Sequence, residues 1–520
     1  MKKLIALALG LLISVSAVGC VGGRRETVTN KDTEIEISFW DSGYGKEYMA
    51  QIVAEFKIMH PEYEIIFTPN QSITGFAQSL QRGANDTTDL YFGSLDALDA
   101  YKDMYEPLDD VYEMIADGET TKIGDKFQDS LKAGLINPDG HYYTLSYAGS
   151  VGGFMYNAKI LDGVTYKVPN TTDELRVLAL ALAANDIPAF IHYQDRSVGY
   201  YNFVITAWQV QYSGLDYYMN RWIKCADEEG NTPDMDTWLS ETDGRKQALK
   251  VLADIITPDT VYPGSNTEEI SLQQTRFLNN GAAMMPNGAW LENEMEGAIA
   301  SDMQLRLMKT PVISAIRDVL PDKSVENDAE LSALVTYIDK VSSGEVAAPT
   351  GDTVSGTGFE VTKADYDRVY TARNQMMGNQ DRHGVILNKY STAKDAAKEF
   401  LRFVFSDRGG QLFAENIHQM PSFTLENPSI IEPDETWSDF ALQCRELQPQ
   451  LQIISGGGYQ RSPMMSLNPV NQYMNIGIIS SLSALNEADR GDADSLWKAV
   501  QQTVRDNWDS WLFNAGYSVD

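Results

Sequence analysis

The chain has 520 residues, more than one compact core usually holds, so two or more lobes are expected. Hydrophobic residues make up 43% and charged residues 22% of the chain, as is ordinary for a globular protein. The formal net charge of -32 argues against nucleic acid or anionic lipid head groups as partners, because both require basic patches, and against strongly anionic ligands unless a local basic pocket overrides the field.

The first twenty residues predict export. Lys2 and Lys3 precede an apolar run over residues 4–18, and Gly19 and Cys20 follow it. This pattern is typical of a secretory signal peptide, and the run is too short to cross a bilayer comfortably as a mature helix. The Gly19-Cys20 junction resembles a bacterial lipobox, which implies that Cys20 carries a lipid and holds the mature chain on the outer face of the cell membrane. An ordinary cleaved signal with a chance cysteine is the alternative.

The residues after the signal predict a tether and then an α/β body. Residues 21–32 are polar and read as a flexible tether. Apolar and polar residues alternate over 34–39, which indicates a strand, and apolar residues recur at helical spacing over 46–59. Residues 63–67 predict a second strand and residues 89–92 a third. A strand, a helix and a strand with short connections form a βαβ unit over a parallel sheet.

Side chains that follow these strands are the first candidates for ligand contacts. In open α/β sheets a ligand lies in the crevice at the carboxyl ends of the strands. Trp40 and Asp41 follow the first predicted strand, and Gly93 and Asp96 follow the third. Tyr44 lies in a glycine-flanked turn beside them. A buried Trp40 and an Asp96 on the exposed face of a helix are the alternatives.

Nine short segments carry a stronger signal through their order along the chain. They are FKIMHPEYEI at 56–65, EPLDD at 106–110, DGHYY at 139–143, MYNAKIL at 155–161, VPNTTDEL at 168–175, FLNNGAAM at 277–284, NGAW at 287–290, AAKEFL at 396–401 and MP at 420–421. Each is weak alone, but in this order they resemble the family-1 extracellular solute-binding proteins, the sugar-binding class of ABC importers.

The resemblance implies a fold. It is a two-lobed α/β fold of the periplasmic-binding-protein type, with a hinge that several strands cross. We expect the first lobe over residues 33–147 and 310–415, and the second over residues 148–309 and 416–520. Residues 314–381 fit no segment of the family and are expected to be an inserted loop region, rich in Ser, Gly, Thr and Pro near its middle.

The resemblance also implies a function. The protein would capture a neutral carbohydrate, an oligosaccharide, between its lobes and deliver it to the transmembrane subunits of an ABC permease. We expect a lipid-anchored monomer that uses no cofactor, no metal and no nucleic acid. Two other classes stay open: a lipid-anchored glycosidase, because 73 acidic residues allow many carboxylate pairs, and a sugar-sensing protein that serves a receptor kinase.

Trp290 is the leading candidate for sugar stacking. By resemblance it matches a sugar-stacking position of the family, and Asp41 and Asp96 fall where carboxylates accept hydrogen bonds from sugar hydroxyls. Asn287 and Gly288 precede Trp290, and a glycine lets a ligand approach the backbone. We expect Trp290 to stand at the edge of the crevice, outside the core.

The predicted crossing between the lobes supplies further candidates. Tyr147 and Ser150 lie in a segment that leads into two glycines, which suits a hinge or a ligand-facing loop. Tyr200 and Tyr201 precede an apolar helix, and we expect one of the two to contact the ligand and the other to point into the core. The remaining cysteines, Cys225 and Cys444, could pair outside the cell or lie as isolated thiols.

The lipobox interpretation predicts the behaviour of a Cys20→Ser variant. Without the thiol that receives the lipid, the protein is released from the membrane or accumulates as an unprocessed precursor. Membrane fractionation and the apparent mass of the band check this. A variant that is processed normally and stays as firmly membrane-bound as the parent would refute the lipid anchor.

Overall fold

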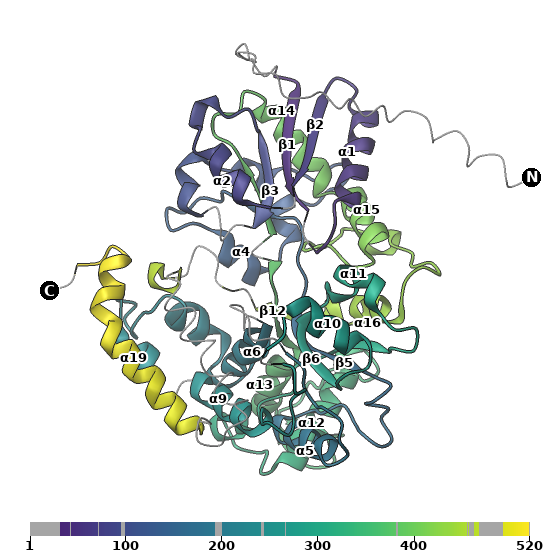
Figure 1. Cartoon of the computed structure of the whole chain (residues 1–520), viewed down its shortest axis with the longest axis vertical. Helices are drawn as coiled ribbons and strands as arrows, with labels where there is room; N and C mark the ends of the chain where they lie inside the picture. The colour runs from purple at the N-terminus through teal and green to yellow at the C-terminus, as the bar shows by residue number, and fades with distance from the viewer. Residues whose placement is uncertain are drawn as a thin grey trace, which may run out of the picture.

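A computed structural model of the chain describes residues 32–41, 43–70, 72–94, 99–192, 200–240, 244–265, 267–380, 383–454, 456, 462–466 and 492–518. These residues form two α/β lobes, seen one above the other in Figure 1. The predicted signal peptide, Cys20 and nearly all of the tether lie outside the described residues. None of the helices in the described ranges combines the length and the apolar character that crossing a bilayer requires.

A five-stranded sheet builds the first lobe, which comprises residues 32–148 and 383–437. Its order is β2 (Glu64–Asn70), β1 (Glu34–Trp40), β3 (Leu90–Ser94), β11 (His383–Leu387) and β4 (Leu145–Ser146). β1 is parallel to β2 and β3, whereas β11 is antiparallel to β3 and β4. The predicted alternation of β1 is confirmed, since Ile35, Ile37 and Phe39 are at most 1% exposed.

Helices pack on this sheet, and aromatic side chains contribute to the core between them. The helices are α1 (Glu47–Met59), α2 (Thr74–Leu80), α3 (Asp109–Glu113), α4 (Asp129–Leu135), α14 (Lys394–Val404) and α15 (Asp407–Ile417). The apolar stripe of α1 is buried as predicted, and the helix ends one residue before His60 and Pro61. Phe56 of α1 meets Phe400 of α14 edge to face at 5.1 Å, so an early and a late part of the chain share one core.

A three-stranded antiparallel sheet forms the centre of the second lobe, to which the described residues within 149–380 and 438–518 belong. Its order is β6 (Met284–Gly288), β5 (Gly152–Asn157) and β7 (Leu305–Met308). A parallel pair, β10 (Gln375–Met377) with β12 (Gln452–Ile454), lies beside it. Its main helices are α5 (Thr172–Ala183), α6 (Tyr201–Ser213), α8 (Met235–Leu239), α9 (Gly244–Ile255), α10 (Ile270–Leu278), α11 (Leu291–Glu294), α16 (Asp439–Leu447) and α19 (Ala493–Asn514).

Residues 314–381 differ from the expected inserted loop. They contain two long helices, α12 (Asp328–Ser342) and α13 (Lys363–Asn374), and a small hairpin of β8 (Thr353–Val354) and β9 (Val361–Thr362). Asn327 caps the first helix by accepting a hydrogen bond from the amide of Glu330, and Thr362 caps the second in the same way. The irregular composition that suggested a loop is confined to the connection between these helices.

The boundary between the lobes also differs from the sequence prediction. Residues 312–372 pack into the core of the second lobe, through Leu331, Leu334 and Val369, and not into the first lobe as expected. Residues 385–431 pack into the core of the first lobe, through Val385 and Phe400. The chain therefore returns to the first lobe at β11, which pairs with β3 on one side and with β4 on the other.

The two remaining cysteines are both free thiols. Cys225 is buried in the second lobe, and burial raises the pKa of its thiol to about 12. Cys444 lies on α16, and burial raises the pKa of its thiol as well. Of the two readings left open by the sequence, the structure shows isolated thiols.

Candidate ligand-binding site between the lobes

An aromatic group lies at the carboxyl end of β1, on the side of the first lobe that faces the second. Trp40 stacks on the His383 ring with centroids 5.4 Å apart and planes 8° apart. Tyr44 and Tyr147 meet the same imidazole edge-on, at 5.1 and 6.2 Å. The amide of Tyr147 donates to the carbonyl of His383 at 3.0 Å, which fixes the approach of the two segments. Three distant parts of the chain thus converge at one sheet edge, as the strand-end rule predicts.

Three phenol hydroxyls near this group are buried without a hydrogen-bond partner in the structure. They belong to Tyr44, Tyr48 and Tyr147. The Tyr44 hydroxyl lies near the side chain of Asn379 without meeting hydrogen-bond geometry. Burial raises the pKa of all three phenols, and each of them also interacts electrostatically with at least one of the others. An unpaired buried hydroxyl costs about 1–3 kcal/mol of stability. A polar ligand group that forms hydrogen bonds with these hydroxyls would remove that cost.

A pair of glycines forms the opposing surface on the second lobe. Gly152 of β5 lies opposite Gly288 of β6 in the sheet. A Cβ atom on Gly152 would stand 2.3 Å from the Phe203 ring, and one on Gly288 would stand 2.0 Å from the Trp290 ring. Both rings therefore lie directly on the backbone, and no side chain other than glycine leaves room for them.

Trp290 joins the two lobes. Its ring lies 5.7 Å from Phe203 and 5.8 Å from Tyr200, and its Cδ1 atom approaches the turn at Gly43 of the first lobe. Trp290 is only 8% exposed and packs with the hydrophobic cluster of the first lobe. The expectation that it stands outside the core is not met in this structure, because the turn at Gly43 closes over it. Its contact with a ligand stays a prediction.

The other candidates from the crossing segment lie as follows. Tyr201 is 2% exposed, and its hydroxyl pairs with Nδ1 of His192 at 3.3 Å. Tyr200 is half-buried against Trp290, so one tyrosine of the pair lies in the core and the other at the interface, and ligand contact by Tyr200 stays a prediction. Ser150 is tied to Asn379, whose Oδ1 accepts from its amide at 2.8 Å.

The remaining candidates have local structural roles. The Asp41 amide donates to the carbonyl of Asn70 at 2.8 Å, and its side chain is half-buried. Gly93 gives room to Phe76, whose ring would be 2.8 Å from an added Cβ atom. Asn287 is fully buried, and its Oδ1 accepts from the amide of Gly288 at 2.8 Å. Asp96 lies outside the described residues. Ligand contact by each of these residues stays a prediction.

Sequence reasoning missed three residues of this site. His383 is the first residue of the buried strand β11, but nothing nearby in the sequence shows that it faces Trp40. Tyr48 lies on the buried stripe of α1 and reads as core. Phe203 lies on α6, and only the pairing of Gly152 with Gly288 places it beside Trp290. The two adjacent glycines at 152 and 153 were the one local signal that could have pointed to this surface.

Comparisons with known proteins agree with this architecture. A family model described as bacterial extracellular solute-binding protein matches residues 51–443. The diacetylchitobiose binding protein NgcE of Streptomyces coelicolor is 21% identical over 284 residues, which cover 53% of this chain and 56% of that protein. The chain thus spans little more than half the length of this curated relative.

Solved structures share the fold over nearly the whole chain. A cyclic alpha-maltosyl-1,6-maltose binding protein from Arthrobacter globiformis has a TM-score of 0.57 at 13% identity, covering 92% of this chain and 99% of that one. An ABC substrate-binding protein from Listeria monocytogenes in complex with cycloalternan has a TM-score of 0.55 at 14% identity, covering 93% and 99%. At these identities the likeness shows the fold alone.

The position of Trp290 predicts a double effect of Trp290→Ala. If the ring stacks on a ligand, its loss weakens binding of that ligand by about 1–3 kcal/mol. It also lowers stability, by up to the roughly 3–5 kcal/mol of an emptied core site. Titration calorimetry and thermal melting separate the two effects.

Trp511→Ala is the matched control for this test. Trp511 is 3% exposed on α19, in the core of the second lobe. Its loss should lower stability and leave sugar affinity per folded molecule unchanged. Equal affinities for the two variants would remove Trp290 from the ligand site.

Proposed function

Because the chain belongs to the bacterial extracellular solute-binding proteins, whose family model covers residues 51–443, we propose that it captures a neutral oligosaccharide between its two lobes. The observation that carries the proposal is the meeting of aromatic rings with buried, unpaired phenol hydroxyls at the interface of the lobes. A sugar offers apolar ring faces that stack on aromatics and hydroxyls that pair with polar side chains. The sugar ligands printed in the names of the relatives support the same class.

Capture requires the lobes to part. Tyr44, Tyr147 and Trp290 are each at most 8% exposed, so a ligand that stacks on them must first separate the rings of the two lobes. The ligand then stabilises the closed form, because it contacts both lobes there and binds that form more tightly than the open form. The crossing strands supply the hinge, where Ser150 and Asn379 hold the two connections together through a pair of hydrogen bonds at 2.8 and 3.1 Å.

Delivery to a membrane permease completes the proposal. The closed form would dock on the transmembrane subunits of an ABC transporter, and a lipid on Cys20 would keep the protein close to them. The family and the signal-like residues 1–20 support this step. The binding-protein names of the relatives favour a carrier over an enzyme.

A thermal-shift screen against neutral saccharides tests the proposed function, because a ligand that binds only the native state raises the melting temperature. The panel contains N-acetylglucosamine oligomers, malto-oligosaccharides and cyclic glucans. We expect at least one oligosaccharide to raise the melting temperature and to be recovered unhydrolysed. Turnover of the sugar would favour a glycosidase, and no shift with any member would count against sugar capture.

The unpaired phenols predict opposite effects of Tyr147→Phe on stability and binding. The variant removes a buried hydroxyl that has no partner, so the free protein is at least as stable as the parent. It loses a hydrogen bond to the sugar and binds it about 3- to 10-fold more weakly, the equivalent of ~0.5–1.5 kcal/mol. Thermal melting and titration calorimetry measure both.

Tyr201→Phe is the control for this pair of effects. Its hydroxyl has a partner in His192, so its removal should lower stability without changing sugar affinity. If Tyr147→Phe also lowers stability and leaves affinity intact, the phenol cluster is not the ligand site.

A further inference from the structure

A second pocket, with a volume of about 520 Å³, opens on the second lobe. Its walls are β7 and the residues after it, the end of α12 and the segment 443–450. None of its lining residues belongs to the interlobe aromatic site. Much of one wall comes from residues 314–381, which contain none of the short motifs that carry the family resemblance. The pocket is therefore separate from the proposed sugar site.

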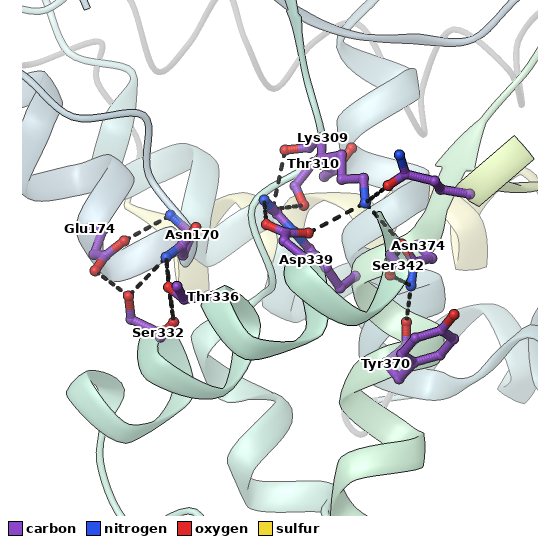
Figure 2. Close-up of polar contacts among 12 residues, drawn as sticks. Asn170, Glu174, Lys309, Thr310, Ser332, Thr336, Asp339, Ser342, Tyr370 and Asn374 are labelled. Carbon is purple, nitrogen blue, oxygen red and sulfur yellow. Dashed lines mark hydrogen bonds and ion pairs between the residues drawn. The ribbon is translucent and has the colours of Figure 1, made fainter. Parts of the chain in front are cut away.

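The floor of the pocket holds two buried cations and one carboxylate. Figure 2 shows Lys309 and Asp339 at its centre, and the side chain of Arg373 also reaches Asp339. Lys309 Nζ lies 3.3 Å from Asp339 Oδ1, and Arg373 binds the same carboxylate through Nε at 3.0 Å and Nη2 at 2.8 Å. The Lys309 and Arg373 side chains are 7% and 6% exposed. The floor is thus one negative charge short of neutrality.

Uncharged oxygen atoms accept the other hydrogen bonds of these two cations. Lys309 Nζ donates to Asn374 Oδ1 and Gln450 Oε1, each at 3.0 Å. Arg373 Nη1 donates to the carbonyls of Lys309 and Thr310 at 3.4 and 3.3 Å. Burial lowers the pKa of Lys309, which Asp339 opposes and the charge of Arg373 reinforces. Two buried cations that share one carboxylate, and otherwise have only amide and carbonyl partners, gain from an added anion.

The walls add groups that suit hydroxyls. Two hydrogen bonds hold Asn170 in position (Figure 2). Its backbone amide donates to the Glu174 carboxylate, and its side-chain Nδ2 donates to Thr336 Oγ1 at 3.0 Å. Tyr156 and Ser343 line the same pocket. At the rim Lys340 and Glu345 lie 3.7 Å apart, with side chains 48% and 64% exposed. Most of the wall groups can both accept and donate hydrogen bonds, as a polyol requires.

We propose that this pocket binds a small hydroxylated carboxylate, the chemical class of the sugar acids. Its carboxylate replaces the Gln450 contact at Lys309, and its hydroxyls face Asn170 and Thr336. The net charge of -32 disfavours anion binding over most of the surface, so a local group of buried cations at the base of a pocket is where an anion can bind. The site acts independently of sugar capture between the lobes.

Titration calorimetry of the full chain with D-glucuronate and D-glucose tests the proposal. The two probes share ring and hydroxyls and differ in the carboxylate. We expect glucuronate to bind, glucose to bind at least 10-fold more weakly, and the glucuronate affinity to fall as salt rises, because the ion pair is screened. Acetate, which has the charge but no hydroxyls, should bind at least 10-fold more weakly than glucuronate.

Two rim variants with opposite predicted effects separate a binding role from a structural one. Lys340→Gln removes a positive charge and should weaken glucuronate binding about two- to fivefold, whereas Glu345→Gln removes a negative charge and should strengthen it by a similar factor. Both side chains are exposed, so neither variant should unfold the protein. Lys122→Gln is the matched control, because Lys122 is also 48% exposed and paired with a glutamate, but on the first lobe.

Lys309→Met removes the floor cation and should weaken glucuronate binding at least 10-fold. A melting curve shows whether the variant folds, and the rim variants keep the test decisive if it does not. The proposal is overturned if glucuronate fails to bind at millimolar concentration, if glucose or acetate binds as well as glucuronate, or if the two rim variants shift affinity in the same direction. Glucuronate binding that no pocket variant changes would place it elsewhere and overturn the proposal as well.

Discussion

The insertion of β11 between β3 and β4 is the constraint on which the rest of the structure depends. β3 precedes the first crossing to the second lobe, whereas β11 arrives only after the chain has built most of that lobe. Without β11, the edges of β3 and β4 would have no backbone partners on those sides. The chain must therefore cross between the lobes more than once, and the paired connections at Ser150 and Asn379 form the hinge. An arrangement of two lobes joined by paired connections follows from this connectivity.

The same strand brings the ligand chemistry together. His383 begins β11 and lies between Trp40, Tyr44 and Tyr147, so the strand that completes the sheet also completes the aromatic group. The second lobe contributes Trp290, whose ring lies directly on Gly288 of its sheet. Within the first lobe, the rings and the unpaired phenols hold their mutual arrangement before any ligand arrives, although the rings of the second lobe must move away from them to admit it. Such preorganisation reduces the entropy that binding costs.

Charge is distributed differently at the two proposed sites. Aromatic rings and neutral phenols dominate the interlobe site, which suits a neutral sugar in a protein of net charge -32. The outer pocket concentrates Lys309 and Arg373 on a single carboxylate, Asp339. The low dielectric of a buried floor lets two cations outweigh a distant negative field that solvent screens. One chain can therefore offer sites for a neutral and for an anionic ligand.

The sequence by itself determined the local elements and the family, while the tertiary structure decided which distant segments contact one another. The strand at Glu34–Trp40 and the helix at Glu47–Met59 were predictable, because the periodicity that indicates each of them lies within a few neighbouring residues. The colinear motifs predicted two lobes and the interlobe position of the site. The lobe that residues 312–372 join, the burial of Trp290 and the meeting of Lys309 with Arg373 were not predictable. They depend on strand pairing and packing between segments far apart in the chain, for which one sequence carries no local signal.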